Sequence, residues 1–152
     1  MWRPKGVTTE QRATFPIVVH TLLVQSGRWF LLRRANTGYL DGAYTLPGGH
    51  VQRGEGVVAA AVRECHEEAG VVVAPADLEL IAVMPYQTAD HQGVDFIARA
   101  EQWSGTPAIA EPQYFDDCCW ADPSALPQPL APYIPALLDM QSQATWFREL
   151  TD

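Results

Sequence analysis

Three glutamates, Glu64, Glu67 and Glu68, follow Arg63 closely in the stretch RECHEE. On an α-helix they project within an arc of about 100°, from two adjacent turns. Like charges three and four residues apart destabilise an isolated helix by a few tenths of a kcal/mol per pair, and Arg63 offsets only part of this. Carboxylates held on one rigid support bind hard divalent cations such as Mg²⁺ or Mn²⁺. The spacing predicts a metal site; the alternative is a solvated acidic face.

The helix that would carry these glutamates lies in the second half of residues 49–71. Small and apolar residues recur there with the period of an α-helix. They are Val57, Val58, Ala61, Val62, Cys65 and Ala69. Gly70 follows the last of them, where a left-handed residue commonly ends a helix. We therefore expect one face of this helix to pack against a core, with the carboxylates beside it.

The whole stretch, GHVQRGEGVVAAAVRECHEEAGV, resembles the signature of the Nudix hydrolases, the Nudix box. The fixed positions that match are Gly49, Glu55, Arg63, Glu64, Glu67, Glu68 and Gly70. Cys65 stands where the family more often has leucine or isoleucine, and it is small and apolar enough to be buried. The resemblance implies an α/β fold in which a mixed β-sheet is sandwiched between helices. It also implies that residues 1–152 form a single Nudix hydrolase domain.

The same resemblance implies roles for the charged residues of the box. Glu67 and Glu68 are expected to be metal ligands, and Glu64 a ligand or the general base. Arg63 and Glu55 are expected to hold the loop on the helix and to orient the ligands. A favourable charge near the helix N-terminus is an equally good explanation of Glu55.

Other candidate ligands and substrate contacts lie outside the helix. The main-chain carbonyl of Gly48 could face the site, because glycine lets the backbone approach closely, and Gly49 is a candidate for substrate contact. Glu111, in a proline-punctuated loop, resembles a metal ligand of related nucleotide hydrolases; Asp116 and Asp117 are its rivals. Arg33 and Arg34, candidates for substrate binding, end a predicted strand and point to opposite faces, so at most one of the two is expected to reach a phosphate; the alternative is a solvated strand end.

Histidines and aromatic residues give weaker signals. His20 is expected to be a strand residue with its hydrogen bonds satisfied, and His91 could touch substrate or water. Base stacking needs an aromatic ring, and the sequence does not choose between Tyr39, Tyr44, Tyr86 and Phe115.

Apolar runs and turn residues predict the remaining elements. We expect strands over residues 17–24, 29–34, 43–46, 78–84, 93–100 and 115–121, and a final helix from Pro135 to about Gln143. Five prolines within residues 122–135 leave room for only a short helical turn there.

Composition restricts the class of protein further. The chain has 152 residues and a formal net charge of −8, which argues against binding to nucleic-acid polymers or acidic membranes. Three cysteines, two of them adjacent, imply no disulfide framework and favour the cytoplasm. No signal peptide or membrane-spanning segment is evident. A homodimer is compatible with the sequence but cannot be deduced from it.

The expected reaction, implied by the resemblance, is Mg²⁺-dependent hydrolysis of a pyrophosphate bond in a nucleoside diphosphate linked to another group. A (deoxy)nucleoside triphosphate, including its oxidised forms, is preferred because the chain is short; it would yield the monophosphate and pyrophosphate. The alternatives are an ADP-ribose or nucleotide-sugar pyrophosphatase and a nucleotide-binding Nudix sensor without activity. A non-hydrolytic isomerase of the same fold is remote, because its catalytic pattern is not found.

Overall fold

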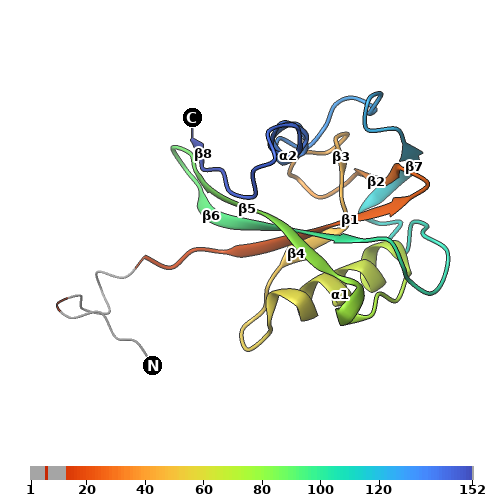
Figure 1. Ribbon diagram of the computed structural model, residues 1–152, viewed down its shortest axis with the longest axis horizontal. Coiled ribbons are helices and arrows are strands. Elements are labelled where there is room, and N and C mark those ends of the chain that lie inside the picture. Colours follow the sequence, from red (N-terminus) through yellow and green to blue (C-terminus); the bar gives the residue numbers. More distant parts are fainter. Residues whose placement is uncertain (1–5, 7–12, 152) are drawn as a thin grey trace.

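The computed structural model describes Gly6 and residues 13–151, which form eight strands, two α-helices and a 3₁₀ helix (Figure 1). The strands are β1 (Ile17–Gln25), β2 (Arg28–Arg34), β3 (Tyr44–Thr45), β4 (Gly48–His50), β5 (Glu79–Gln87), β6 (Gln92–Ala100), β7 (Phe115–Ala121) and β8 (Leu150–Thr151). The helices are α1 (Val57–Ala69), η2 (Pro75–Asp77) and α2 (Tyr133–Ser142). In the described part of the chain, no helix has the length and apolar character needed to cross a membrane.

The sheet is mixed, as the sequence predicts. Its strands follow the order β3-β2-β1-β6-β5-β8, with β4 paired to β1 and β7 paired to β2. The β1–β6 and β5–β8 pairs are parallel, and the other pairs are antiparallel. The long central strand β1 contacts β2, β4 and β6, so it places the short strand β4 next to the middle of the sheet.

The two α-helices cover opposite faces of the sheet (Figure 1). On one face, Ala60 and Ala61 of α1 pack against Val19 of β1 and Ala98 of β6. On the other face, α2 packs against a larger apolar cluster that includes Leu22 of β1. Because side chains alternate along a strand, successive residues of β1 point alternately toward the α1 layer and the α2 layer. The expected α/β sandwich is confirmed.

Helix α1 ends as the sequence predicts. Gly70 has φ of 71°, in the left-handed region. Its N–H donates to the carbonyl of His66 (3.1 Å), and the N–H of Val71 donates to the carbonyl of Cys65 (3.4 Å). These two bonds satisfy main-chain carbonyls at the helix end. The helix therefore ends at Ala69, directly beyond the glutamates.

Some boundaries differ from the expected ones. Helix α2 begins at Tyr133, two residues before Pro135, because proline is tolerated within a helix's first turn. The expected strand over 43–46 is reduced to the two residues of β3, and β4, η2 and β8 were not predicted. On α1, Val58 and Val62 are only half-buried, whereas Ala60 and Glu64 are buried.

Candidate active site

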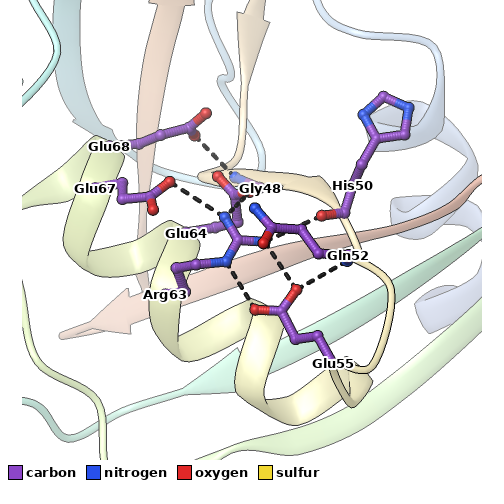
Figure 2. Close-up of polar contacts among 8 residues, drawn as sticks. All are labelled: Gly48, His50, Gln52, Glu55, Arg63, Glu64, Glu67 and Glu68. Atoms are coloured by element: carbon purple, nitrogen blue, oxygen red, sulfur yellow. Dashed lines mark hydrogen bonds and ion pairs between the residues drawn. The ribbon is translucent and has the colours of Figure 1, made fainter.

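Arg63 is the centre of a network of hydrogen bonds that joins α1 to the preceding loop (Figure 2). Its Nε and Nη2 donate to the two carboxylate oxygens of Glu55, at 2.7 and 3.0 Å. Its Nη1 donates to Glu64 (2.6 Å) and to Glu67 (3.2 Å), and Nη2 also donates to the carbonyl of His50 (3.0 Å). One guanidinium thus fixes three carboxylates and one main-chain oxygen.

Glu55 lies in the loop before α1 and connects this loop to the Arg63 network. It is not part of the first turn of the helix. The helix has no acidic residue in its first turn, and Glu55 lies before its N-cap, Gly56. The carboxylate also accepts the main-chain N–H of Gln52 (2.9 Å). The bonds from Arg63 and from this N–H lower the pKa of Glu55 to about 2. Glu55 therefore stays ionised and paired with Arg63 over the ordinary pH range.

Glu68 is held by the backbone of β4. The N–H of Thr21 donates to the carbonyl of Pro47 and that of Val51 to the carbonyl of Ile17, so the polar main-chain groups of Gly48 point away from β1. The Gly48 N–H donates to Glu68 Oε2 at 2.9 Å (Figure 2). The Gly48 carbonyl, on the same outward side, remains available to a ligand.

Burial changes the proton affinity of Glu68. Loss of contact with water, together with the charges of Glu64 and Glu111, raises its pKa to about 8, although the Gly48 hydrogen bond and the charge of Arg34 act in the opposite direction. Near neutral pH this carboxyl group is therefore largely protonated when no cation faces it.

Glu64 lies deeper than its helical position alone suggests. It is 8% exposed, and burial raises its pKa even though Arg63 opposes the shift. A Cβ placed on Gly49 would overlap the Glu64 carboxylate, so the absence of a side chain at Gly49 provides its space. A Cβ on Gly48 would likewise overlap the carbonyl of Val19 in β1. The two glycines let β4 lie between β1 and the acidic face of α1.

Glu111 faces the same group of acids from a different part of the chain. Its loop is bonded to the end of α1, since the N–H groups of Ala108 and Ala110 donate to the carbonyls of Ala69 (3.1 Å) and Glu68 (3.0 Å). Burial raises the pKa of Glu111, and the charges of Glu67 and Glu64 add to the effect. Glu111 is therefore close enough to the helix carboxylates to interact with them electrostatically.

The two arginines of β2 have different surroundings. Arg33 pairs with Asp116 through Nε at 2.6 Å, and its guanidinium lies over the ring of Tyr44. Arg34 donates to the carbonyl of Tyr39 (2.8 Å) and to Thr37 (3.0 Å). Arg34 is the one whose charge reaches Glu68. Asp116 and the neighbouring Asp117, which accepts a hydrogen bond from Tyr44, are engaged in this separate network.

The oxygen donors suit a hard divalent cation, although they are not closed around one point. Glu64, Glu67, Glu68, Glu111 and the Gly48 carbonyl supply the donors, and all are oxygens, as Mg²⁺ prefers. Within residues 13–151, no three acidic, histidine or cysteine side chains converge closely enough to hold one ion. Bonds to Arg63 and Gly48 hold the carboxylates in separate orientations. The donor chemistry fits a cation, and the carboxylates would have to turn toward one another to bind it.

Main-chain groups complete the site in ways that the sequence did not predict. The N–H of Gly48, the carbonyl of His50 and the N–H of Gln52 all hold charged side chains in place. No side-chain pattern encodes these bonds, because every residue carries the same groups. Two adjacent glycines before a loop were the only sequence signal for a close backbone approach.

Comparisons with known proteins agree with this architecture. The family model described as NUDIX domain matches residues 14–140. A crystal structure of a MutT NUDIX hydrolase from Burkholderia pseudomallei is 28% identical, with a TM-score of 0.77, over 84% of this chain and 98% of that one. The solution structure of the E. coli ORF135 protein is 23% identical, with a TM-score of 0.69, over 85% and 92%. A UDP-X diphosphatase is 18% identical, with a TM-score of 0.66, over 93% and 68%. The last two likenesses concern the fold.

Proposed function

The chain belongs to the Nudix family of pyrophosphohydrolases, and we propose that it cleaves a pyrophosphate bond in a (deoxy)nucleoside triphosphate, releasing the monophosphate and pyrophosphate. Nudix hydrolases generally act on small nucleotide substrates with the help of a divalent metal. We further propose that the metal is Mg²⁺, with Mn²⁺ as a substitute, and that the protein acts in the cytoplasm as a single Nudix domain spanning residues 1–152.

One observation carries the proposal: Glu68, Glu64 and Glu111 concentrate acidic charge beside the outward-facing backbone of Gly48. Arg63 neutralises the neighbouring acids only in part, because its donors are shared between Glu55, Glu64 and Glu67. Without a cation Glu68 is largely protonated near neutral pH, and a cation in the site would favour its ionised form. A pyrophosphate substrate adds negative charge and likewise favours a bound cation.

We assign each residue a role from its place in the network. Glu67 and Glu68, the Gly48 carbonyl and Glu111 would hold the metal, and Glu64 would be a further ligand or the general base. When bound, Mg²⁺ would supply positive charge to the transferring phosphoryl group and make a nearby water more acidic. Burial raises the pKa of Glu64, which makes its carboxylate a stronger proton acceptor than that of an exposed glutamate.

The supporting residues keep these groups in place. Arg63 orients Glu64 and Glu67, and Glu55 fixes Arg63 by two parallel hydrogen bonds. Gly49, whose lack of a side chain makes space for Glu64, allows the substrate phosphates to approach β4 closely. Arg34, whose charge reaches the site, is better placed than Arg33 to bind a phosphate, because Arg33 is paired with Asp116.

Likeness to the neighbours favours a substrate other than a sugar nucleotide. The identity and TM-score are higher for the MutT NUDIX hydrolase than for the UDP-X diphosphatase. The test is a pyrophosphate and phosphate release assay over the canonical and 8-oxo triphosphates, ADP-ribose and sugar nucleotides, with Mg²⁺ and with EDTA. Release of pyrophosphate from a triphosphate only with Mg²⁺ supports the proposal. Turnover confined to ADP-ribose or sugar nucleotides, or none at all with nucleotide still bound, contradicts it.

A further inference from the structure

The α1 face of the sheet is covered only in part, because α1 packs mainly on β1 and β4. Figure 1 shows the joined ends of β5 and β6, with β8 beside them, clear of this helix. Paired residues of neighbouring strands place their side chains on the same face of a sheet, and Phe96 of β6 lies on the α1 side. The strand pairing places seven apolar residues on that side, which we call the open face: Ile17, Leu80, Val83, Pro85, Val94, Phe96 and Phe147.

Large side chains of the open face are exposed to water. Phe147 is 46% exposed and Leu80 is 45% exposed, and Ile17 is exposed as well. Trp146, whose ring meets that of Phe147 edge to face, is 67% exposed. Together with the exposed Phe15, two residues before Ile17, these side chains leave roughly 500 Å² of apolar surface in contact with water, if an aromatic side chain has about 150–250 Å². Contiguous apolar patches of a few hundred Å² commonly mark interaction surfaces.

The segment after α2 holds Trp146 and Phe147 in fixed positions. The N–H of Val83 donates to the carbonyl of Trp146 (2.8 Å), and the N–H of Arg148 donates to the carbonyl of Val83 (3.2 Å). Arg148 also pairs with Asp139 of α2 through Nη1, at 2.6 Å. The two aromatic side chains are therefore ordered before any partner binds, which lowers the entropic cost of association.

Charge and area both favour a second copy of the chain as the partner. The formal net charge is −8, so two copies repel each other unless they meet through uncharged surface, and none of the seven residues of the open face is charged. A standard interface buries about 800 Å² per partner, and in homodimers about 65% of that area is apolar. The roughly 500 Å² of exposed apolar side chains matches this apolar share.

We propose that two copies form a homodimer by packing their open faces on each other about a two-fold axis, as the two sheets of a β-sandwich pack. Such an interface is isologous, so each copy contributes Leu80, Trp146 and Phe147 to one continuous apolar layer. Removal of these side chains from water drives the association. None of the open-face residues belongs to the proposed reaction site, so the dimer does not depend on the proposed reaction.

The test measures the mass of the full chain by sedimentation equilibrium at concentrations from about 1 to 500 μM. It compares the wild type with Leu80→Glu, Phe147→Glu and the control Val72→Glu, whose side chain is exposed outside the open face. We expect the wild type to reach twice the 16.8 kDa of one chain. Each glutamate enters a two-fold interface twice as an unpaired charge, so Leu80→Glu and Phe147→Glu should raise the dissociation constant about 100-fold or more. Val72→Glu carries the same change of charge and should not raise it.

A wild-type mass of one chain at every concentration would overturn the proposal, including the case in which another segment of the same chain covers the open face. A dimer that Leu80→Glu and Phe147→Glu leave intact would place the interface elsewhere and overturn it as well. Should these variants fail to fold by circular dichroism, a mixture of isotope-labelled and unlabelled wild type decides the question. We expect intermolecular nuclear Overhauser effects between the Phe147 ring and open-face side chains such as Val83. A dimer that shows such effects only for other residues contradicts the assignment.

Discussion

Replacing Glu68 by glutamine should make the metal-free protein more stable at alkaline pH while removing most of its activity. Burial raises the pKa of Glu68 to about 8 from an ordinary value of 4.5. Glutamine has nearly the same shape, and its side-chain oxygen can still accept the Gly48 N–H, which lies 2.9 Å from Glu68 Oε2. The substitution thus removes the charge and keeps the packing.

The direction in which stability changes with pH follows from the protonation of Glu68 in the folded and unfolded proteins. Below about pH 4.5 the carboxyl group is protonated in both states and costs no stability. Between pH 4.5 and 8 the unfolded protein releases this proton and the folded one retains it, so stability falls by up to about 1.4 kcal/mol per pH unit. The full pKa difference amounts to about 5 kcal/mol above pH 8. Because water partly reaches the side chain, we expect Glu68→Gln to be about 2–4 kcal/mol more stable than the wild type at pH 8.

The assay is urea unfolding in EDTA at pH 5 and pH 8, with Glu79→Gln as an exposed control. The difference between Glu68→Gln and the wild type should be small at pH 5 and large at pH 8, with no such trend in the control. With Mg²⁺ and substrate, kcat should fall about 10²–10³-fold. A variant that is equally stable at both pH values would refute the burial argument, and near-normal activity would refute the ligand role.

Three further substitutions test the remaining parts of the site. Arg63→Ala should lower kcat about 10–100-fold with an unchanged circular dichroism spectrum, because Glu64 and Glu67 lose the donor that orients them; an unchanged kcat would contradict this role. Gly49→Ala should lower kcat at least about tenfold, since the new Cβ displaces the Glu64 carboxylate, and a pH–rate profile like that of the wild type would argue otherwise. Glu111→Gln should raise the Mg²⁺ concentration for half-maximal rate about tenfold with little effect on Tm; an unaltered Mg²⁺ dependence would exclude Glu111 from the metal site.

The sequence predicted the elements whose own residues determine them. The helical period and Gly70 located α1, and the apolar runs located β1, β2 and β7. Strand β4 could not be predicted, because Gly48 and Gly49 have low strand propensity and are held there by pairing with β1. Strand β8 is similarly held by its pairing with β5. Such short elements depend on tertiary partners.

In the candidate site, too, some features could be predicted from the sequence and others depend on tertiary contacts. The spacing of Glu64, Glu67 and Glu68 placed them on adjacent turns, but their different depths depend on β4. Glu64 is buried because Gly49 leaves space, and Glu68 is held because Gly48 turns its N–H outward. His20 Nδ1 has no hydrogen-bond partner among the described residues, contrary to the expected satisfied histidine, and this too depends on what α2 and β4 place around it. A helical projection contains none of this information.

The arrangement of charge explains why a fold would keep an unfavourable group of acids. Arg63 pairs with Glu55, Glu64 and Glu67, whereas the charges of Glu64 and Glu111 help to raise the pKa of Glu68. The carboxylates beside Gly48 are therefore not fully balanced by positive charge. This deficit lies next to main-chain groups, which the mutation of a side chain does not remove. A cation relieves this deficit most when Glu68 is ionised, so cation binding, proton release and the stability of α1 are coupled. That coupling links the destabilising glutamates to the capacity for chemistry on a pyrophosphate.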